Sequence, residues 1–175
     1  NDTVINRQGE AIYIRDEADG TLMSPTYLPL RSEQGTHVAR HGFGYTVFER
    51  NVHNLRMELL QLVPLSDSIK LSRLKLSNDG TTSRTLTVTA YVEWVLGVSR
   101  GNSAPFITTS IDDVSGAMLA RNPWKIRNGE QVAFLDMGGK QSSWTGDRRE
   151  FLGAHGDMAA PSAYIKGGKL SNRVG

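Results

Sequence analysis

The chain has 175 residues, of which 38% are hydrophobic, enough for one domain with a packed core. It has no cysteine, which excludes disulfides, thiolate metal sites and cysteine nucleophiles and is typical of a reducing compartment. Twenty Lys and Arg residues oppose eighteen Asp and Glu residues, and the two signs are mixed along the chain, so we expect no nucleic-acid binding. No apolar run approaches the roughly 20 residues that span a membrane.

The first third of the chain predicts short strands between turn signals. We expect strands at Glu10–Arg15, Thr36–Arg40 and Tyr45–Phe48, which are rich in aromatic and β-branched residues. The segment Leu55–Val63 carries apolar residues at both helical and strand spacing. Because Pro64 ends it early, we interpret it as a strand.

A longer strand is predicted at Arg84–Leu96. The even positions from Leu86 to Leu96 are apolar, whereas the odd positions from Thr85 to Glu93 are three threonines, a tyrosine and a glutamate, so one face should be buried. We expect the core to include Leu86, Val88, Val92 and Trp94. If Trp94 is core, its replacement by Ala should cost about 3–5 kcal/mol.

The preceding segment, Ile69–Ser77, is expected to form a hairpin with Arg84–Leu96. The connection contains Asp79-Gly80, which turns favour. The apolar residues of Ile69–Ser77 change phase near its middle, which predicts a bulge at Ser72–Arg73.

The rest of the chain predicts strands at Phe106–Ile111, Ala117–Arg121 and Gln131–Met137, again between turn signals. Many short strands without a convincing helix between them predict an all-β antiparallel sandwich.

Histidines are the first candidates for chemistry. His37 and His41 would share one face of a strand, and together with His53 they could suggest a metal site. Because no cysteine or zinc-type motif accompanies them, we expect no metal and no cofactor. The glycine-rich Gly42–Tyr45 lacks the spacing of a phosphate loop, and glycine within a strand more often marks a bulge or a close approach.

Glu93 is the best single candidate for a catalytic carboxylate, because apolar neighbours could raise its pKa. Glycoside hydrolysis needs a pair of carboxylates. We therefore prefer the alternative that Glu93 lies on a polar face or pairs with an arginine, and we expect no catalytic residue in this chain.

Aromatic side chains at loop edges are candidates for sugar recognition, and Trp124 and Trp144 lie at such edges. The segment Trp144–Gly156 adds paired arginines and flexible glycines, and an arginine fork can hold hydroxyl groups. We predict substrate-binding residues at Trp144, Asp147, Arg148, Arg149 and Glu150. The alternative is a solvated charged turn.

Five segments occur in order in one frame: GEAIYIRD, SPTYLP, RHGFGYTVFE, TAYVEWVLG and TGDRREFLG. As a set they resemble the β-sandwich domain that precedes the catalytic barrel in cyclic β-1,2-glucan synthases and, more distantly, in cellobiose and chitobiose phosphorylases. The resemblance implies a galactose-mutarotase-like antiparallel super-sandwich, with allowance for missing amino-terminal strands. Residues 1–175 would be a single carbohydrate-binding-like domain, a fragment of a larger multidomain enzyme.

The resemblance also implies a function. It predicts a non-catalytic carbohydrate-binding or scaffold domain of a glycosyltransferase acting on β-glucans. Its partners would be β-glucan or glucoside chains, the adjacent (α/α)6 barrel and a second copy in a homodimer. We expect a cytoplasmic domain that does not insert into a membrane, with a parent anchored in the bacterial inner membrane. In similar phosphorylases, a loop from the part of the sandwich that matches Trp144–Gly156 reaches the active site.

Two alternatives come from other classes. One is a purely structural or dimerisation domain of an inverting, cellobiose-phosphorylase-like β-glucoside phosphorylase. The other is a complete small glycosidase, which the missing carboxylate pair disfavours.

The purified chain should release no glucose 1-phosphate from a β-glucan in the presence of phosphate. It has no persuasive acid pair, and the resemblance implies that the general acid and the phosphate site of such enzymes belong to the helical barrel. A coupled assay for glucose 1-phosphate measures this directly. Phosphate-dependent release above a heat-inactivated control would contradict the expectation.

Overall fold

The computed structural model describes residues 8–124, 130–165 and 167–175. The chain divides into two compact units, residues 1–91 and 92–175. Strands dominate the first unit, whereas the second combines three short strands with short helices. The sheets are antiparallel, so the chain as a whole is mostly β with a few short helices, as predicted. Within the described residues, no helix is long and apolar enough to cross a membrane.

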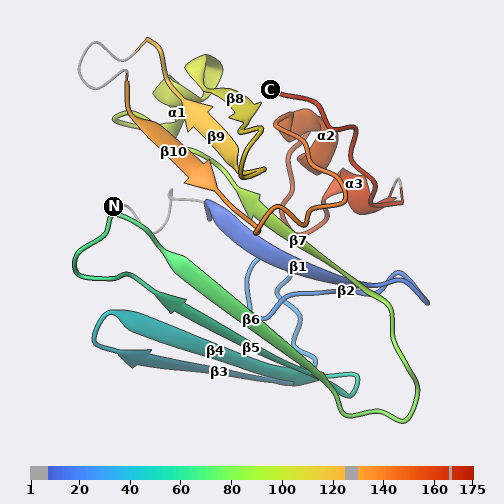
Figure 1. Ribbon diagram of the computed structural model, residues 1–175. Coiled ribbons are helices and arrows are strands. Elements are labelled where there is room, and N and C mark those ends of the chain that lie inside the picture. The colour runs from blue at the N-terminus through green and yellow to red at the C-terminus, as the bar shows by residue number, and fades with distance from the viewer. Residues whose placement is uncertain (1–7, 125–129, 166) are drawn as a thin grey trace. The chain divides into compact units, whose positions relative to one another are not determined.

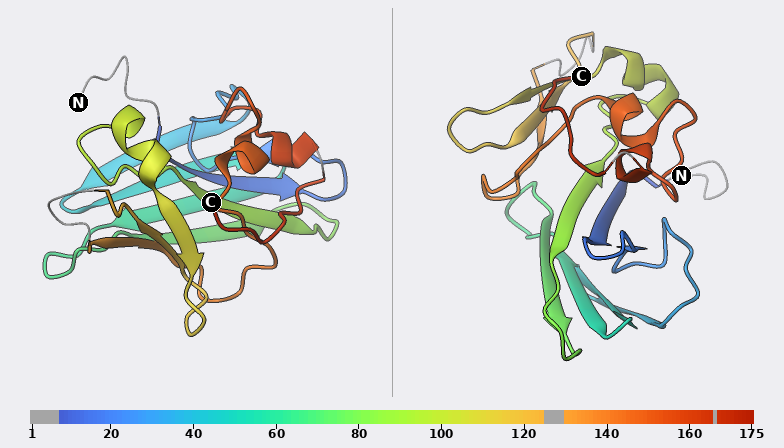
Figure 2. Two further views of the ribbon diagram at one scale, coloured as in Figure 1. Left: turned by 90° about the horizontal axis from the view of Figure 1, so that it is seen from above. Right: turned by 90° about the vertical axis from the view of Figure 1, so that its right-hand side faces the viewer.

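The first unit contains a four-stranded sheet whose strands lie side by side in chain order (Figures 1 and 2). They are β3 (Thr36–Gly42), β4 (Tyr45–Val52), β5 (Leu55–Leu62) and β6 (Leu71–Asn78). The strand interpretation of Leu55–Val63 is therefore confirmed. Between β4 and β5, His53 and Asn54 have positive φ angles of 51° and 58°, the backbone of a tight two-residue hairpin turn.

A second sheet in this unit has the order β2 (Leu22–Met23), β1 (Glu10–Asp16) and β7 (Leu86–Val92). The predicted hairpin between Ile69–Ser77 and Arg84–Leu96 is therefore wrong, because β6 pairs with β5 and the chain then crosses to the other sheet. A connection of this length does not fix which strands pair, unlike a two-residue turn.

The predicted bulge at Ser72–Arg73 is also wrong. Leu71–Asn78 pairs residue for residue with Leu55–Leu62 over the whole length of both strands. The apolar phase changes because Leu71 is on the outer face, where it is 48% exposed, while Leu74 packs against the core.

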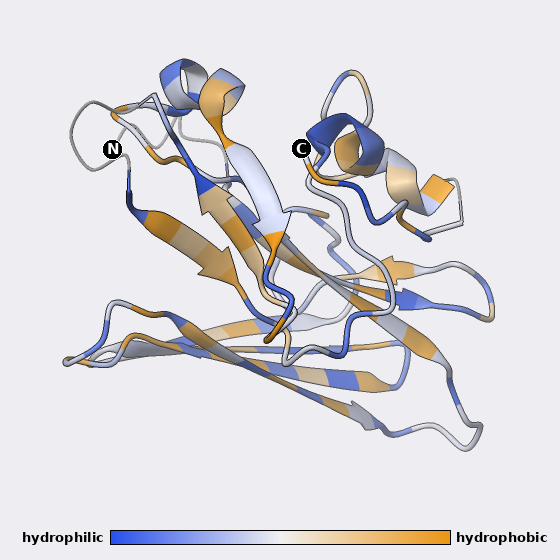
Figure 3. Cartoon of the chain, turned by 45° about the horizontal axis from the view of Figure 1, so that its top comes forward, coloured by the Kyte–Doolittle hydropathy of each residue, from blue (hydrophilic) through white to orange (hydrophobic). Residues whose placement is uncertain are grey.

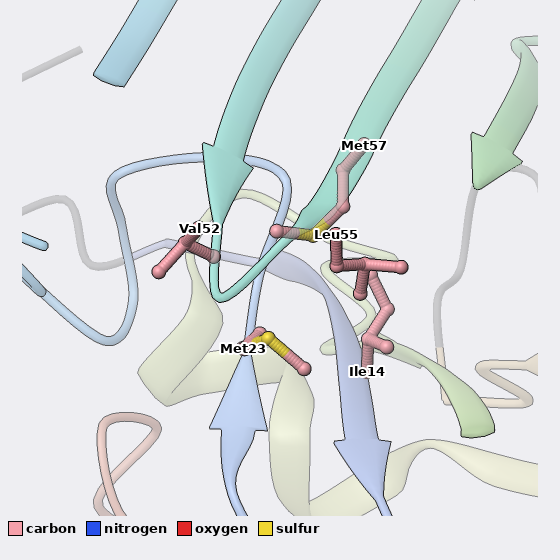
Figure 4. Packing of buried hydrophobic residues seen from close by; sticks show 5 residues of the cluster. All are labelled: Ile14, Met23, Val52, Leu55 and Met57. Carbon is pink, nitrogen blue, oxygen red and sulfur yellow. The ribbon is translucent and has the colours of Figure 1, made fainter. Parts of the chain in front are cut away.

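The core of the first unit lies between its two sheets. Ile14 and Met23 come from one sheet, and Val52, Leu55 and Met57 from the other, and Figure 4 shows the five side chains gathered together. This packing follows from the alternation of polar and apolar residues along the strands (Figure 3).

The core prediction for the strand after Arg84 is correct in part. Leu86 and Val88 pack against the buried cluster, although both are partly exposed. The strand ends at Val92 rather than at Leu96, and Val92 and Trp94 are half-buried. A loss of 3–5 kcal/mol for Trp94→Ala is therefore too large, because that range applies to fully buried aromatics.

Arg84 joins the two sheets of the first unit. Its Nη2 lies 2.6 Å from the carboxylate of Asp16 at the end of β1, and its Nε donates to the same carboxylate at 2.8 Å. Its Nη1 donates to the His53 carbonyl in the β4–β5 turn at 2.7 Å. Hydrogen bonds from the Ala18 N–H and from Arg84 lower the pKa of Asp16.

The second unit contains a three-stranded antiparallel sheet of order β10 (Val132–Leu135), β9 (Met118–Arg121) and β8 (Thr108–Ile111). Its short helices are α1 (Arg100–Ser103), the 3-10 turn η1 (Ala104–Phe106), α2 (Arg148–Leu152) and α3 (Ser162–Ile165). The strand predicted from Phe106 begins at Thr108, because Pro105 favours the 3-10 turn before it.

Replacing Asp16 by Asn should reduce the free energy of unfolding at neutral pH by about 3 kcal/mol, because Arg84 loses the partner of a buried ion pair. Folding lowers the pKa of Asp16 below its ordinary value of 3.8. Its stabilising contribution is therefore complete above about pH 4 and is lost as the pH falls through the folded pKa. Urea denaturation at several pH values should show the gap between wild type and variant closing in acid.

Asp79→Asn is the matched control. Arg56 donates to both oxygens of Asp79, but the two side chains are 62% and 38% exposed, so this variant should lose much less stability than Asp16→Asn. Equal losses for Asp16→Asn and Asp79→Asn would show that Arg84 does not hold the sheets together.

Candidate functional site

The predicted binding segment Trp144–Gly156 contains a short helix, α2. Asp147 begins α2, and its Oδ1 accepts the N–H groups of Arg149 at 2.8 Å and Glu150 at 3.3 Å. An aspartate is a preferred residue at this capping position. The helix buries Phe151 and Leu152. It ends at Gly153, whose φ of 91° favours glycine.

The carboxylate of Glu150 holds the last residues of the chain. It accepts hydrogen bonds from the Thr145 hydroxyl at 2.6 Å, the Ser171 hydroxyl at 2.7 Å and the Ser171 N–H at 2.8 Å. Burial alone would raise the pKa of Glu150, but these hydrogen bonds and the nearby Arg173 hold it below its ordinary value. Glu150 is therefore an ionised structural anchor.

Arg148 faces Glu93. Its Nε donates to Glu93 Oε1 at 2.5 Å, and Arg100 approaches the other oxygen at 3.3 Å. The Glu93 side chain is 14% exposed, so it is a nearly buried carboxylate between two guanidinium groups. The interpretation of Glu93 as the partner of an arginine is confirmed, and Arg148 is engaged in that pair.

A pocket of about 580 Å³ opens beside α2. Its lining includes Asp147, Arg149, Glu150, Gly153, Ser162 and Arg173. Three of the five predicted binding residues thus come together there, namely Asp147, Arg149 and Glu150. Trp144 and Arg148 are not part of the lining.

The charges in the pocket lining are balanced. Asp147 and Glu150 oppose Arg149 and Arg173, and Arg173 lies 3.6 Å from Asp147 in an exposed ion pair. The hydroxyl of Ser162 is buried and has no hydrogen-bond partner among the described residues. The pocket therefore offers donors and acceptors without a large net charge, which suits a neutral, hydroxyl-rich ligand.

Sequence reasoning missed Ser162 and Arg173. A parallel bridge between Thr145 and Arg173 brings the chain end next to α2, and Ser162 begins α3, which packs on α2. Both contacts depend on tertiary structure, and neither residue lies in a motif that could have indicated it.

Trp144 is half-buried and tied to the chain end. Its N–H donates to the side-chain oxygen of Asn172, and the Asn172 N–H donates to the Trp144 carbonyl, both at 2.9 Å. These bonds fix its backbone beside the pocket segment.

The three histidines weighed as metal ligands each have another polar neighbour. A ring nitrogen lies within 3.1 Å of Ser32 O for His37, of Thr46 Oγ1 for His41 and of Gln34 Oε1 for His53. In the part of the chain that the structure describes, no three histidine or acidic side chains are grouped to hold a metal ion.

The sequence matches known proteins along its length. The model of the family described as "Glycosyl hydrolase 94, supersandwich domain" matches residues 1–175. The chain is 37% identical over 171 residues to the cyclic beta-(1,2)-glucan synthase NdvB of Rhizobium meliloti, an alignment that covers 98% of the chain. It is 25% identical over 160 residues to the solabiose phosphorylase of Paenibacillus borealis, covering 89% of the chain. It is 21% identical over 173 residues to the N,N'-diacetylchitobiose phosphorylase of Vibrio furnissii, covering 95%.

These relatives are much longer. The alignments span 6% of the synthase and 21% and 22% of the two phosphorylases. The family match covers the whole chain, and it agrees with the antiparallel sheets of both units. The chain belongs to the supersandwich domain family of glycosyl hydrolase 94.

Proposed function

We propose that this chain is a non-catalytic, carbohydrate-binding domain of a glycosyltransferase of the cyclic β-1,2-glucan synthase type. The observation that carries the proposal is the charge-balanced pocket beside α2, within the segment predicted for sugar contact. The 37% identity to a glucan synthase favours a β-glucan as the ligand.

The lining supports a neutral sugar more than an anion. Arg149 is exposed at the pocket, and Arg173 is 62% exposed, so both guanidinium groups can reach a ligand. Two carboxylates share the same pocket and would repel a phosphate group. Sugar hydroxyls can both donate to these carboxylates and accept from the arginines.

The carboxylates near the pocket support a non-catalytic role. Glu93 is held between two arginines, Glu150 accepts three hydrogen bonds, and Asp147 caps a helix. A general acid needs a raised pKa and a second carboxylate across the scissile bond, whereas the pKa of Glu150 is lowered. In this proposal the longer parent protein is cytoplasmic, and its helical barrel carries out the catalysis.

A second candidate is a structural or dimerisation domain of an inverting β-glucoside phosphorylase. The intramolecular bonds of Arg148, Asp147 and Glu150 favour it. These bonds would stabilise the segment whether or not a sugar binds. The similarity to phosphorylases is consistent with it.

Titration calorimetry with a linear β-1,2-linked glucooligosaccharide tests the proposal. A shallow pocket should give a dissociation constant near millimolar, about 4 kcal/mol. Arg149→Ala and Ser162→Ala should each weaken binding about fivefold, because each removes one hydrogen-bonding group. Lys140→Ala, an exposed change outside the pocket lining, should leave the affinity unchanged.

Arg148→Ala separates binding from stability. It leaves Glu93 with Arg100 alone, so it should lower the free energy of unfolding more than Arg149→Ala does, while retaining affinity in the folded fraction. Absence of measurable heat with wild-type protein at several times the expected dissociation constant would favour the structural alternative.

A further inference from the structure

A second surface of the second unit carries an exposed aromatic pair. Trp124 is 74% exposed and Phe106 is 39% exposed. Their ring centroids lie 5.3 Å apart with the planes tilted by 34°. Trp124 follows β9, Phe106 ends η1, and neither belongs to the pocket lining.

Buried polar groups order the chain next to this pair. Asn122 is 7% exposed, its Nδ2 donates to the Leu96 carbonyl at 2.8 Å, and its Oδ1 accepts the Trp124 N–H at 3.1 Å. On the Phe106 side, Ser103 is 2% exposed and donates to the Ser99 carbonyl at 2.8 Å. Hydrogen bonds therefore fix the backbone at Trp124 and hold α1, the helix that precedes η1 and Phe106.

Folding does not account for this exposure. A tryptophan gives its largest stabilisation when its surface is removed from water, and here most of that surface stays in water. A rigid aromatic side chain loses little conformational entropy when a ligand packs on it. The arrangement has the properties of a preorganised platform.

Exposed polar residues occur close to the pair in the sequence. Thr108 follows Phe106 by two residues, Arg121 precedes Trp124 by three, and these two exposed residues are register partners in the β8–β9 ladder. Exposed aromatic rings suit a sugar ring, whose C–H groups pack on the negative face of an aromatic ring while its hydroxyls reach outward to water or to polar side chains.

We propose that Trp124 and Phe106 form a second contact with the glucan, and that one sugar residue of the glucan stacks on these two rings. This inference rests on the proposed function for the identity of the ligand, but not on the pocket. The tilt between the rings gives a bent platform, which fits a sugar ring or the junction between two rings better than a flat stack.

The test is a nuclear magnetic resonance titration of the 175-residue chain with the same β-1,2-linked oligosaccharide. The indole N–H signal of Trp124, assigned by its loss in Trp124→Phe, should shift with added sugar. Trp124→Ala should weaken binding about fivefold, and Trp124→Phe less, because a ring remains. Val114→Ala is the matched control, since Val114 is 95% exposed in the same unit, and should bind like wild type.

The backbone amides of Arg149 and Ser171 report the pocket in the same titration. If those amide signals shift with added sugar and the Trp124 indole signal does not, the aromatic contact is overturned and the pocket is supported. If the Trp124 indole signal shifts and the pocket amide signals do not, the aromatic contact is supported and binding in the pocket is contradicted. No shift at either would overturn both. Self-association that Trp124→Ala abolishes, with sugar affinity unchanged, would assign the pair to a protein contact and overturn the proposal.

Discussion

The ion pair of Arg84 with Asp16 is the interaction on which the first unit depends. One guanidinium reaches the carboxylate at the end of β1 and the carbonyl in the β4–β5 turn, so it holds both sheets at the point where the chain crosses between them. Hydrophobic packing of Ile14, Met23 and Leu55 fills the space between the sheets, but packing is not directional. The charged hydrogen bonds supply the fixed geometry at the edge of that core.

The second unit uses its acidic residues in a similar way. Glu93 binds two arginines, Glu150 holds the chain end, and Asp147 begins α2. The pKa of Glu150 is lowered and its oxygens accept hydrogen bonds, so this carboxylate is suited to holding structure rather than to transferring protons. Arg149 and Arg173 remain exposed at the pocket, where the proposed function uses them to bind a ligand.

Local patterns predicted local structure well. The early stop at Pro64 identified β5 despite its partial helical spacing, and the lack of a second carboxylate favoured an arginine pair over catalysis for Glu93. Pairing between distant segments was not predictable, because a connection as long as 79–85 allows β7 to join either sheet. In the same way, Asp147, Arg149 and Glu150 could be found in one segment, whereas Ser162 and Arg173 reach the pocket through tertiary contacts alone.

The central claim is that the pocket beside α2 takes a neutral, hydroxyl-rich ligand. The most direct measurement compares binding of a neutral β-1,2-glucooligosaccharide and of inorganic phosphate to the same protein, at low and at high salt. Two arginines balanced by two carboxylates predict sugar affinity that is insensitive to salt, and no phosphate binding. Phosphate binding that weakens with salt and is lost in Arg149→Ala, without sugar binding, would contradict the account.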